Sequence, residues 1–204
     1  MPKQTFFNLS AQKRQTIEQA ALDEFAEYGF DASNMNRIVE QSKIAKGSFY
    51  QYFEDKKDLY FYLIDTLFRK KLQAIEPVLK VYEEHSLSHN LKEIFRFGLE
   101  FSANDPKLHR LGEDFSTMQR PFVLEFLDKY KPETTDIYIS LLTHAREIGE
   151  LREDVDISLA AVFISAIIKQ ATFILMENNM RERETVVREL LSFIERAILK
   201  QQVI

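Results

Sequence analysis

The sequence predicts an all-α protein in which short helices come first and long helices follow. Apolar residues recur at spacings of three and four along most of the chain, which is the helical period. Gly and Pro number only 5 each among 204 residues, too few for the many tight turns of a sandwich or barrel. The β-branched run at 162–168 is ambiguous locally, but its length and helical flanks favour a helix.

The first sixty residues carry the start and stop signals of a compact helical unit. Ser10 is a suitable N-cap for a long helix, and Gly29 is a suitable C-terminal stop for it. The apolar pattern then predicts two short helices, over about 34–42 and 45–52. Asp55 marks the start of the next long helix.

Longer helices are predicted in the rest of the chain. Asp105 followed by Pro106 is the pattern of an N-cap with proline in the first turn. We expect Asp156 to cap an apolar helix over about 157–177, and a last helix over about 183–200.

Composition narrows the class of protein. Cys is absent, which excludes disulfides, thiol nucleophiles and thiolate metal sites. The N-terminal residues lack the apolar core of a signal peptide, and the most apolar stretch, 159–176, is broken by polar residues. We therefore expect a soluble, cytoplasmic protein with no membrane partner. Residues 1–60 carry 8 Lys and Arg against 9 Asp and Glu. Any DNA contact must therefore use a local surface that exposes cations, with the acidic residues turned away from it.

The very short connection between the two predicted short helices, Lys43-Ile44, gives the geometry of a helix-turn-helix. The second of these helices opens with a cation and two small residues, which would let the backbone approach a DNA groove closely. Lys46 can bind a phosphate or a guanine edge, and the Gln51 amide matches adenine. Phosphate oxygens also suit two hydroxyls and a further cation nearby, which are Tyr50, Tyr52 and Lys56.

The stretch from Phe25 to Leu59 resembles the DNA-binding domain of TetR-type transcriptional regulators. The residues that carry the resemblance are Tyr28-Gly29-Phe30, Ile38-Val39, Lys46-Gly47-Ser48-Phe49-Tyr50, Tyr52-Phe53 and Lys56-Lys57-Asp58-Leu59. The chain departs from the usual family pattern at three places, which are Ser33-Asn34, Ser42-Lys43-Ile44 and Tyr52. These departures concern the operator sequence and leave the class of protein unchanged.

The resemblance implies two domains and a set of DNA contacts. A three-helix DNA-binding domain is expected over 1–57, with its helix-turn-helix at about 34–53, and a helical effector-binding and dimerisation domain over 58–204. The residues implied as phosphate contacts are Ser33, Lys46, Tyr50, Tyr52 and Lys56. Those implied near base edges are Gly47, Ser48 and Gln51, with Arg37 and Lys43 as further candidates. The alternative is a surface helix whose polar residues are merely solvated.

Phe is frequent, with 17 residues, and many of them lie in the middle of the chain. Aromatic lining with a few polar groups is typical of small-molecule pockets, so we expect a site for a flat or hydrophobic effector. The residues expected there are Phe97, Phe101, Phe115, Met118, Phe122, Phe126, Tyr138 and His144. The alternative is that these side chains form an ordinary core.

The last two predicted helices are apolar on more than one face, whereas a helix that packs on one side shows a single stripe. We therefore expect a four-helix interface between two copies of the chain, as the resemblance also implies. The residues expected in it are Phe163, Ile167, Leu175, Val187, Leu190, Leu191, Ile194 and Ile198. The alternative is that both faces are covered within one subunit.

Catalysis and metal binding have little support in the sequence. His85 and His89 are four residues apart beside two glutamates, but this stretch reads as a solvated loop between helices. Nucleophile elbows, HExxH motifs and phosphate-cradling glycine loops are missing from the sequence. We expect no catalytic residue, no metal and no cofactor.

Together these features predict a homodimeric transcriptional regulator, a repressor that a small hydrophobic molecule releases from a palindromic operator in double-stranded DNA. Two alternatives stay open, which are an effector-independent DNA-binding protein and a helical interaction module. Activation in place of repression is equally compatible with the sequence, which identifies neither the operator nor the effector.

Overall fold

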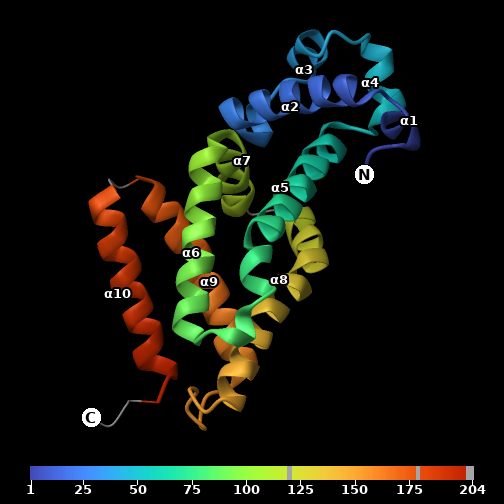
Figure 1. Cartoon of the computed structure of the whole chain (residues 1–204). Helices are drawn as coiled ribbons and strands as arrows, with labels where there is room; N and C mark the ends of the chain where they lie inside the picture. Colours follow the sequence, from blue (N-terminus) through green and yellow to red (C-terminus); the bar gives the residue numbers. More distant parts are fainter. Residues whose placement is uncertain (119–120, 178–179, 201–204) are drawn as a thin grey trace. The chain divides into compact units, whose positions relative to one another are not determined.

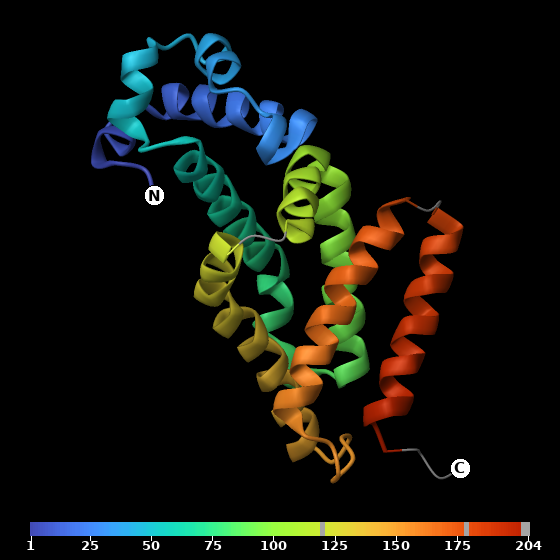
Figure 2. The ribbon, with the colours of Figure 1, turned by 180° about the vertical axis from the view of Figure 1, so that it is seen from behind.

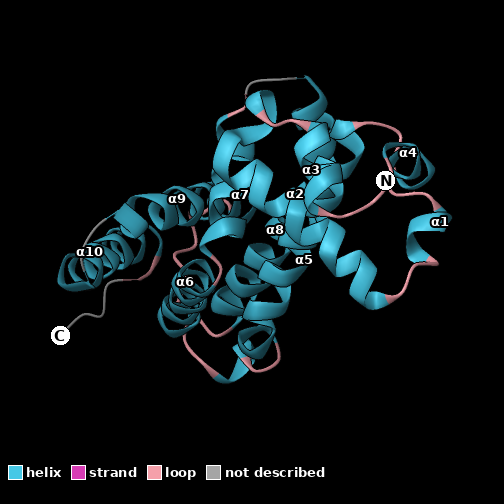
Figure 3. Ribbon diagram, turned by 90° about the horizontal axis from the view of Figure 1, so that it is seen from above, coloured by secondary structure: helices cyan, strands magenta, loops and turns pink. Residues whose placement is uncertain are grey.

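A computed structural model describes residues 1–118, 121–177 and 180–200, and it confirms the predicted all-α class. For residues 124–125, 127–134, 169, 172–177 and 180–183 the backbone alone is described. Helices and loops make up these described segments, with no strand among them (Figure 3). An isolated bridge pairs Leu151 with Leu199.

The chain forms two compact units that are each discontinuous in sequence. The first unit contains residues 1–70 and 105–123, and the second contains residues 71–104 and 124–204. A helix from the middle of the chain therefore packs with the N-terminal helices. The division into functional domains after residue 57 stays a prediction.

The first unit contains the helix-turn-helix. Its helices are α1 (Gln4–Phe7), α2 (Ala11–Ala32), α3 (Met35–Gln41), α4 (Lys46–Tyr52), the first part of α5 (Lys56–Leu79) and α7 (Pro106–Thr117) (Figure 1). Helix α2 packs against both α3 and α7, and α4 packs against α1 and α3. Phe49 and Phe53 are four residues apart and almost fully buried, so they fix the rotation of α4 about its axis.

The structure confirms the predicted helix starts. They could be predicted because capping is a local interaction. The side chains of Ser10, Asp55, Asp105 and Asp156 each accept a hydrogen bond from the backbone N–H three residues further on. The Asn34 side chain caps the short helix α3 in a similar way, by accepting from the Asn36 N–H at 2.9 Å.

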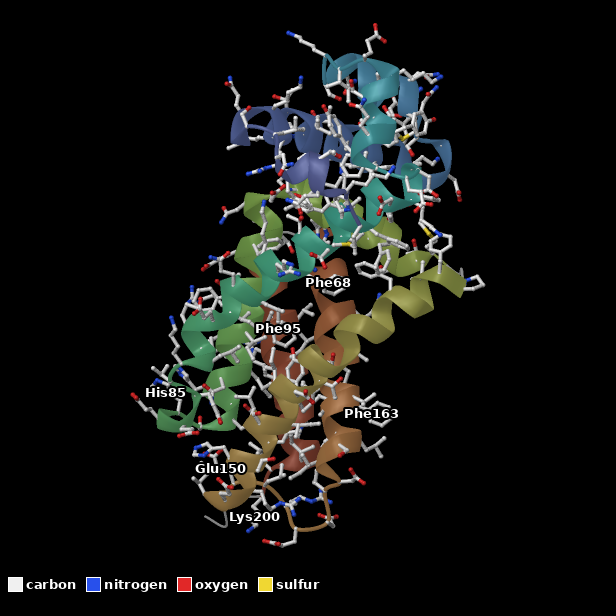
Figure 4. The ribbon with its side chains drawn as sticks, turned by 90° about the vertical axis from the view of Figure 1, so that its right-hand side faces the viewer. Phe68, His85, Phe95, Glu150, Phe163 and Lys200 are labelled. Carbon is white, nitrogen blue, oxygen red and sulfur yellow. The ribbon has the colours of Figure 1, made fainter. Side chains whose placement is uncertain are left out.

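The second unit is built from α6 (Leu87–Asn104), most of α8 (Pro121–Glu147), α9 (Ile157–Glu177) and α10 (Met180–Ile198). Helices α6, α9 and α10 lie side by side (Figure 2). The C-terminal end of α10 is fixed to the loop before α9, because the Arg152 N–H donates to the Ile198 carbonyl at 3.0 Å. The Lys200 N–H donates to the Glu150 carbonyl nearby, at 2.9 Å (Figure 4).

Gly29 leaves helical geometry, with φ 67° and ψ 178°, but α2 continues to Ala32 and does not end at Gly29 as predicted. A Cβ at this position would lie 2.7 Å from Oδ1 of Asp114 on α7. The other carboxylate oxygen of Asp114 accepts from the Phe30 N–H at 3.1 Å and from the Tyr60 hydroxyl at 2.7 Å. Only glycine therefore allows α7 to approach the end of α2 this closely.

We expect Gly29→Ala to lower the free energy of unfolding by about 2–3 kcal/mol, measured by chemical denaturation. The left-handed backbone costs about 1–2 kcal/mol with a Cβ, and the displaced Asp114 would lose hydrogen bonds worth about 1 kcal/mol each. Gly149→Ala is the matched control, because Gly149 has φ 81° but nothing within 4 Å of an added Cβ. If both variants lost the same free energy of unfolding, the contact with Asp114 would not contribute to the effect of Gly29→Ala.

Candidate nucleic-acid interface

The turn after α3 and the outer side of α4 bring six of the predicted DNA contacts together. The six are Lys43, Lys46, Gly47, Ser48, Tyr50 and Gln51, and all are exposed except Ser48, which is half-buried. They place cations, a small residue, hydroxyls and an amide on one short stretch of backbone. No side chain caps the N-terminus of α4, where the Ser48 N–H donates to the Ala45 carbonyl at 2.9 Å. We call these six residues the α4 face.

The turn that aims the α4 face is a Schellman motif with lysine at the position where glycine is usual. Lys43 has φ 53°, its N–H donates to the Glu40 carbonyl at 3.1 Å, and the Ile44 N–H donates to the Val39 carbonyl at 3.3 Å. The hydrogen bonds of the motif are complete, but the Cβ of Lys43 makes the left-handed backbone unfavourable. A strained cation at the centre of a helix-turn-helix suggests that its side chain serves binding.

We expect Lys43→Gly to raise the free energy of unfolding by about 0.5–1 kcal/mol, because glycine adopts this backbone without strain. Lys43→Ala removes the same charge but keeps the Cβ, and it should leave stability within about 0.5 kcal/mol of the parent. Thermal and chemical denaturation of the two variants separate strain from charge. Equal stability of the two variants would refute the strain at Lys43.

Two of the predicted phosphate contacts, Ser33 and Lys56, are used instead to close the end of α2. Ser33 is buried, and its hydroxyl donates to the Phe30 carbonyl at 2.7 Å. The Lys56 ammonium donates to the carbonyls of Phe30 at 2.7 Å and Ser33 at 3.2 Å, and it lies 4.8 Å from the centre of the Phe30 ring. Both residues thus have partners within the first unit, and their contact with DNA stays a prediction.

Arg37 is also committed within the protein. Its guanidinium donates to both carboxylate oxygens of Glu24, with Nε at 2.9 Å from each, and lies 4.2 Å from the centre of the Tyr28 ring. Burial raises the pKa of Glu24, but hydrogen bonds from Arg37 and the Asn34 N–H, with the charge of Arg37, outweigh burial and lower it overall. Arg37 thus anchors α3 to α2, and its contact with DNA stays a prediction.

Tyr52, another predicted phosphate contact, is turned towards the core. Its ring is 8% exposed and packs near Phe6, with the ring centres 6.3 Å apart. Tyr52 lies three residues after Phe49, so both side chains point from α4 towards the core. A buried ring in this place supports the position of α4 and is not part of its exposed face.

Sequence reasoning missed Glu24 and Asp114, which hold the helix-turn-helix from inside. Glu24 could have been found, because it falls on the apolar stripe of α2 between Ala21 and Phe25 and is 2% exposed. Asp114 gave no local signal, since its partners Phe30 and Tyr60 are more than fifty residues away in sequence.

The residues predicted to line an effector site divide between the two units. Phe115, Met118 and Phe122 belong to the first unit. There Phe122 packs near Phe30 and Phe61, with ring centres at 5.8 and 5.5 Å. The remaining five, Phe97, Phe101, Phe126, Tyr138 and His144, belong to the second unit.

Within the second unit Tyr138 lies in the apolar core and Phe97 packs against that core. The ring of His144 meets the Tyr82 ring edge-on at 5.8 Å, and its Nε2 is buried with no hydrogen-bond partner among the described residues. Burial raises the pKa of Tyr138 above its ordinary value. Polar groups inside this aromatic core are compatible with a ligand site, which stays a prediction.

The residues predicted for a dimer interface differ in exposure. Phe163 is 58% exposed and projects from α9 (Figure 4), whereas Ile167, Val187 and Leu190 are half-buried. Three others are covered within the chain, which are Leu191, Ile194 and Ile198, and the interface itself stays a prediction. The side chain of Leu175 lies outside the described part of the structure.

The two histidines considered for metal binding come close together. His85 precedes α6 in a loop as predicted, but His89 lies in the first turn of α6, and the ring centres are 4.3 Å apart. Among the described residues no group of three or more His, Cys, Asp or Glu side chains could hold a metal ion. The described helices also contain no stretch long and apolar enough to cross a membrane.

Two short helices joined by a tight turn, with a polar outer face on the second and a shared core beneath, define a helix-turn-helix protein. Comparison with known proteins agrees. Residues 17–63 match the family described as bacterial regulatory proteins, tetR family. The "Fatty acid metabolism regulator protein" of Bacillus subtilis is 26% identical over 175 residues, which cover 83% of this chain and 86% of that protein.

Solved structures show the same fold along the whole chain. A TetR family transcriptional regulator from Chloroflexus aurantiacus is 26% identical, with a TM-score of 0.72, and the match covers 98% of this chain and 100% of that one. The regulator FadR from Bacillus subtilis, in complex with stearoyl-CoA, is 22% identical with a TM-score of 0.72 over 88% of this chain and 96% of that one. Residues 17–63 therefore match the DNA-binding domain of the tetR family, and the chain as a whole has the fold of a TetR family transcriptional regulator.

Proposed function

We propose that the protein is a homodimeric repressor in the cytoplasm, released from a palindromic operator when a long-chain acyl ligand binds. The proposal that the protein binds DNA rests on the α4 face. Phe49 and Phe53 are buried beneath it, so the rotation of α4 turns Lys46, Tyr50 and Gln51 outward together.

Within the α4 face we assign roles by side-chain chemistry. Lys46 and the Tyr50 hydroxyl contact phosphates, and Lys43 adds a charge at the turn. Gly47 and Ser48 allow the backbone to approach the major groove, where the Gln51 amide can read adenine. The net charge of −5 makes this small face the part of the molecule that must supply the attraction to DNA.

We expect Lys46→Ala with Tyr50→Phe to weaken operator binding about 10- to 100-fold and to lower the salt slope by about one phosphate, or 0.9. Both side chains are exposed, so the fold should survive. Lys80→Ala is the charge-matched control, because Lys80 is an exposed cation of the second unit. Unchanged affinity and slope in the double variant would favour the interaction-module alternative.

The dimer proposal rests on an apolar stripe that the chain leaves uncovered. Ala160, Ile164 and Ile168 face the core from α9, while the opposite side of that helix is also apolar. Leu159, Val162 and Phe163 on that side are 46–58% exposed. Large exposed apolar side chains at helical spacing are costly in water and typically mark an interface.

A second copy is the partner that fits this stripe. A two-fold axis brings the same stripe of each subunit against its equivalent, so no complementary surface is needed elsewhere on the chain. Two linked α4 faces then bind one duplex, which raises the effective concentration of the second and favours a palindromic operator. Phe193, which is 60% exposed on α10, extends the proposed interface.

We expect Phe163→Glu to weaken dimerisation about 100-fold or more in analytical ultracentrifugation, because the interface would bury an unpaired charge. Ile148→Glu places the same charge at an apolar side chain that is 50% exposed outside the stripe, and it should remain dimeric. A Phe163→Glu protein that sediments as a dimer would contradict the interface on α9.

The effector is inferred from the relatives and from the aromatic residues of the second unit. The similarity to a fatty acid metabolism regulator spans 83% of the chain, and a protein of the same fold binds stearoyl-CoA. A long acyl chain needs an apolar channel, and the second unit offers Phe97, Phe101, Phe126 and Tyr138. We propose these residues as contacts for the acyl chain.

Within the first unit, Asp114 couples α7 to the helix-turn-helix. Helix α7 joins the first unit through that carboxylate, which binds the Phe30 N–H and the Tyr60 hydroxyl at the end of α2. Burial, then the hydrogen bond to Asp114 and its charge, raise the pKa of Tyr60, so the phenol stays protonated and donates. A ligand that displaces α7 would therefore displace the helix-turn-helix with it.

We expect stearoyl-CoA to release a fluorescent operator from the protein, measured by anisotropy, and operator DNA to weaken stearoyl-CoA binding by the same factor. Coenzyme A alone and acetyl-CoA are the controls, because they lack the long chain. Release by coenzyme A alone would contradict an acyl ligand, and no release by any of the three would favour the effector-independent alternative.

A further inference from the structure

Helix α4 has only seven residues, and a helix this short is unstable by itself. Its last four carbonyls, from Phe49 to Tyr52, lack partners within the helix. The Phe53 N–H takes the first of them, since it donates to the Phe49 carbonyl at 2.9 Å. The other three must be satisfied by groups from outside α4.

All three of those carbonyls are bound by two residues from the start of the chain. The Lys3 N–H donates to the Tyr52 carbonyl at 2.8 Å, and the Lys3 ammonium donates to the Tyr50 carbonyl at 2.8 Å. The Thr5 hydroxyl donates to the Gln51 carbonyl. The partners are 46 or more residues apart in sequence, so this contact belongs to the tertiary structure.

The residues that hold α4 are themselves anchored in the core. Phe6 is 0% exposed, with its ring centre 4.8 Å from that of Phe53 and 5.3 Å from that of Tyr62. Pro2 is also buried. Residues 2–7, which we call the N-terminal segment, are therefore anchored in the core and hydrogen-bonded to the C-terminal end of α4.

We propose that the N-terminal segment is a positioning element for DNA recognition, in which Lys3, Thr5 and Phe6 hold α4 in the orientation that reads the operator. The inference rests on the proposed role of α4. The N-terminal segment should therefore affect how well the protein distinguishes its operator from other DNA. A loosened α4 can still attract phosphates, but it no longer aligns with base edges.

The Thr5 hydroxyl allows a sharp test. Thr5→Val keeps the shape of the side chain but removes the donor, and we expect it to lower operator affinity about 5-fold, the value of one net hydrogen bond. Affinity for random-sequence DNA and the salt slope should stay the same, because no phosphate contact is lost. Thr5→Ser restores the donor and should bind as the parent does.

Two further variants provide a control and a second test. Gln4→Ala is the control on the same segment, because the Gln4 side chain is exposed and donates to the Asn8 side chain at 3.2 Å. Phe6→Leu loosens the anchor without changing charge, and it should also reduce operator affinity more than random-DNA affinity. Hydrogen exchange at the amides of 49–53 should accelerate in Thr5→Val and Phe6→Leu, with α3 unchanged.

Equal losses on operator and random DNA with a smaller salt slope would overturn the proposal in favour of a direct phosphate contact. Unchanged operator affinity with unchanged exchange in α4 would overturn it outright. If the parent protein bound no DNA, the role of α4 would fail, and the exchange measurement alone would decide whether the segment holds the helix.

Discussion

The helix-turn-helix depends on how the end of α2 is held. Gly29 leaves helical geometry inside α2 and the helix ends at Ala32, so the backbone groups exposed around the break and the helix end must find partners. Asp114 binds the Phe30 N–H, Lys56 binds the Phe30 carbonyl, and Glu24 binds the Asn34 N–H. Because these partners come from α7, α5 and α2, the break fixes three elements at once and sets the direction in which α3 leaves.

This constraint explains why several polar residues of a DNA-binding motif face the protein. Ser33, Arg37 and Lys56 all satisfy groups near the end of α2. The desolvation cost of the buried Glu24 carboxylate is offset by Arg37, and removing either partner would leave a buried group unpaired. Among the cations predicted to contact DNA, Lys43 and Lys46 are exposed, whereas Arg37 and Lys56 are half-buried.

The parts of the structure that depend on neighbours in sequence could be predicted. Helix starts at Ser10, Asp105 and Asp156 follow from one side chain and an N–H three residues away, and the break at Gly29 follows from one residue. The exposed α4 face follows from the spacing of Phe49 and Phe53.

Contacts between distant segments could not be predicted. The hydrogen bonds of Lys3 and Thr5 to α4 and of Asp114 to Tyr60 join residues more than forty positions apart, and nothing local marks them. The same difficulty explains the division of the proposed effector residues between two units and the burial of Leu191, Ile194 and Ile198. Apolar periodicity shows that a face is covered but not whether the same chain or a second copy covers it.

The central claim is that a dimer reads DNA through two α4 faces held at a fixed orientation. Selection of duplexes from a random pool by the purified protein, followed by the affinity of the selected sequence across salt concentrations, tests it most directly. We expect a palindromic sequence bound by one dimer with a steep salt slope. No enriched sequence and a flat slope, from folded dimeric protein, would contradict it.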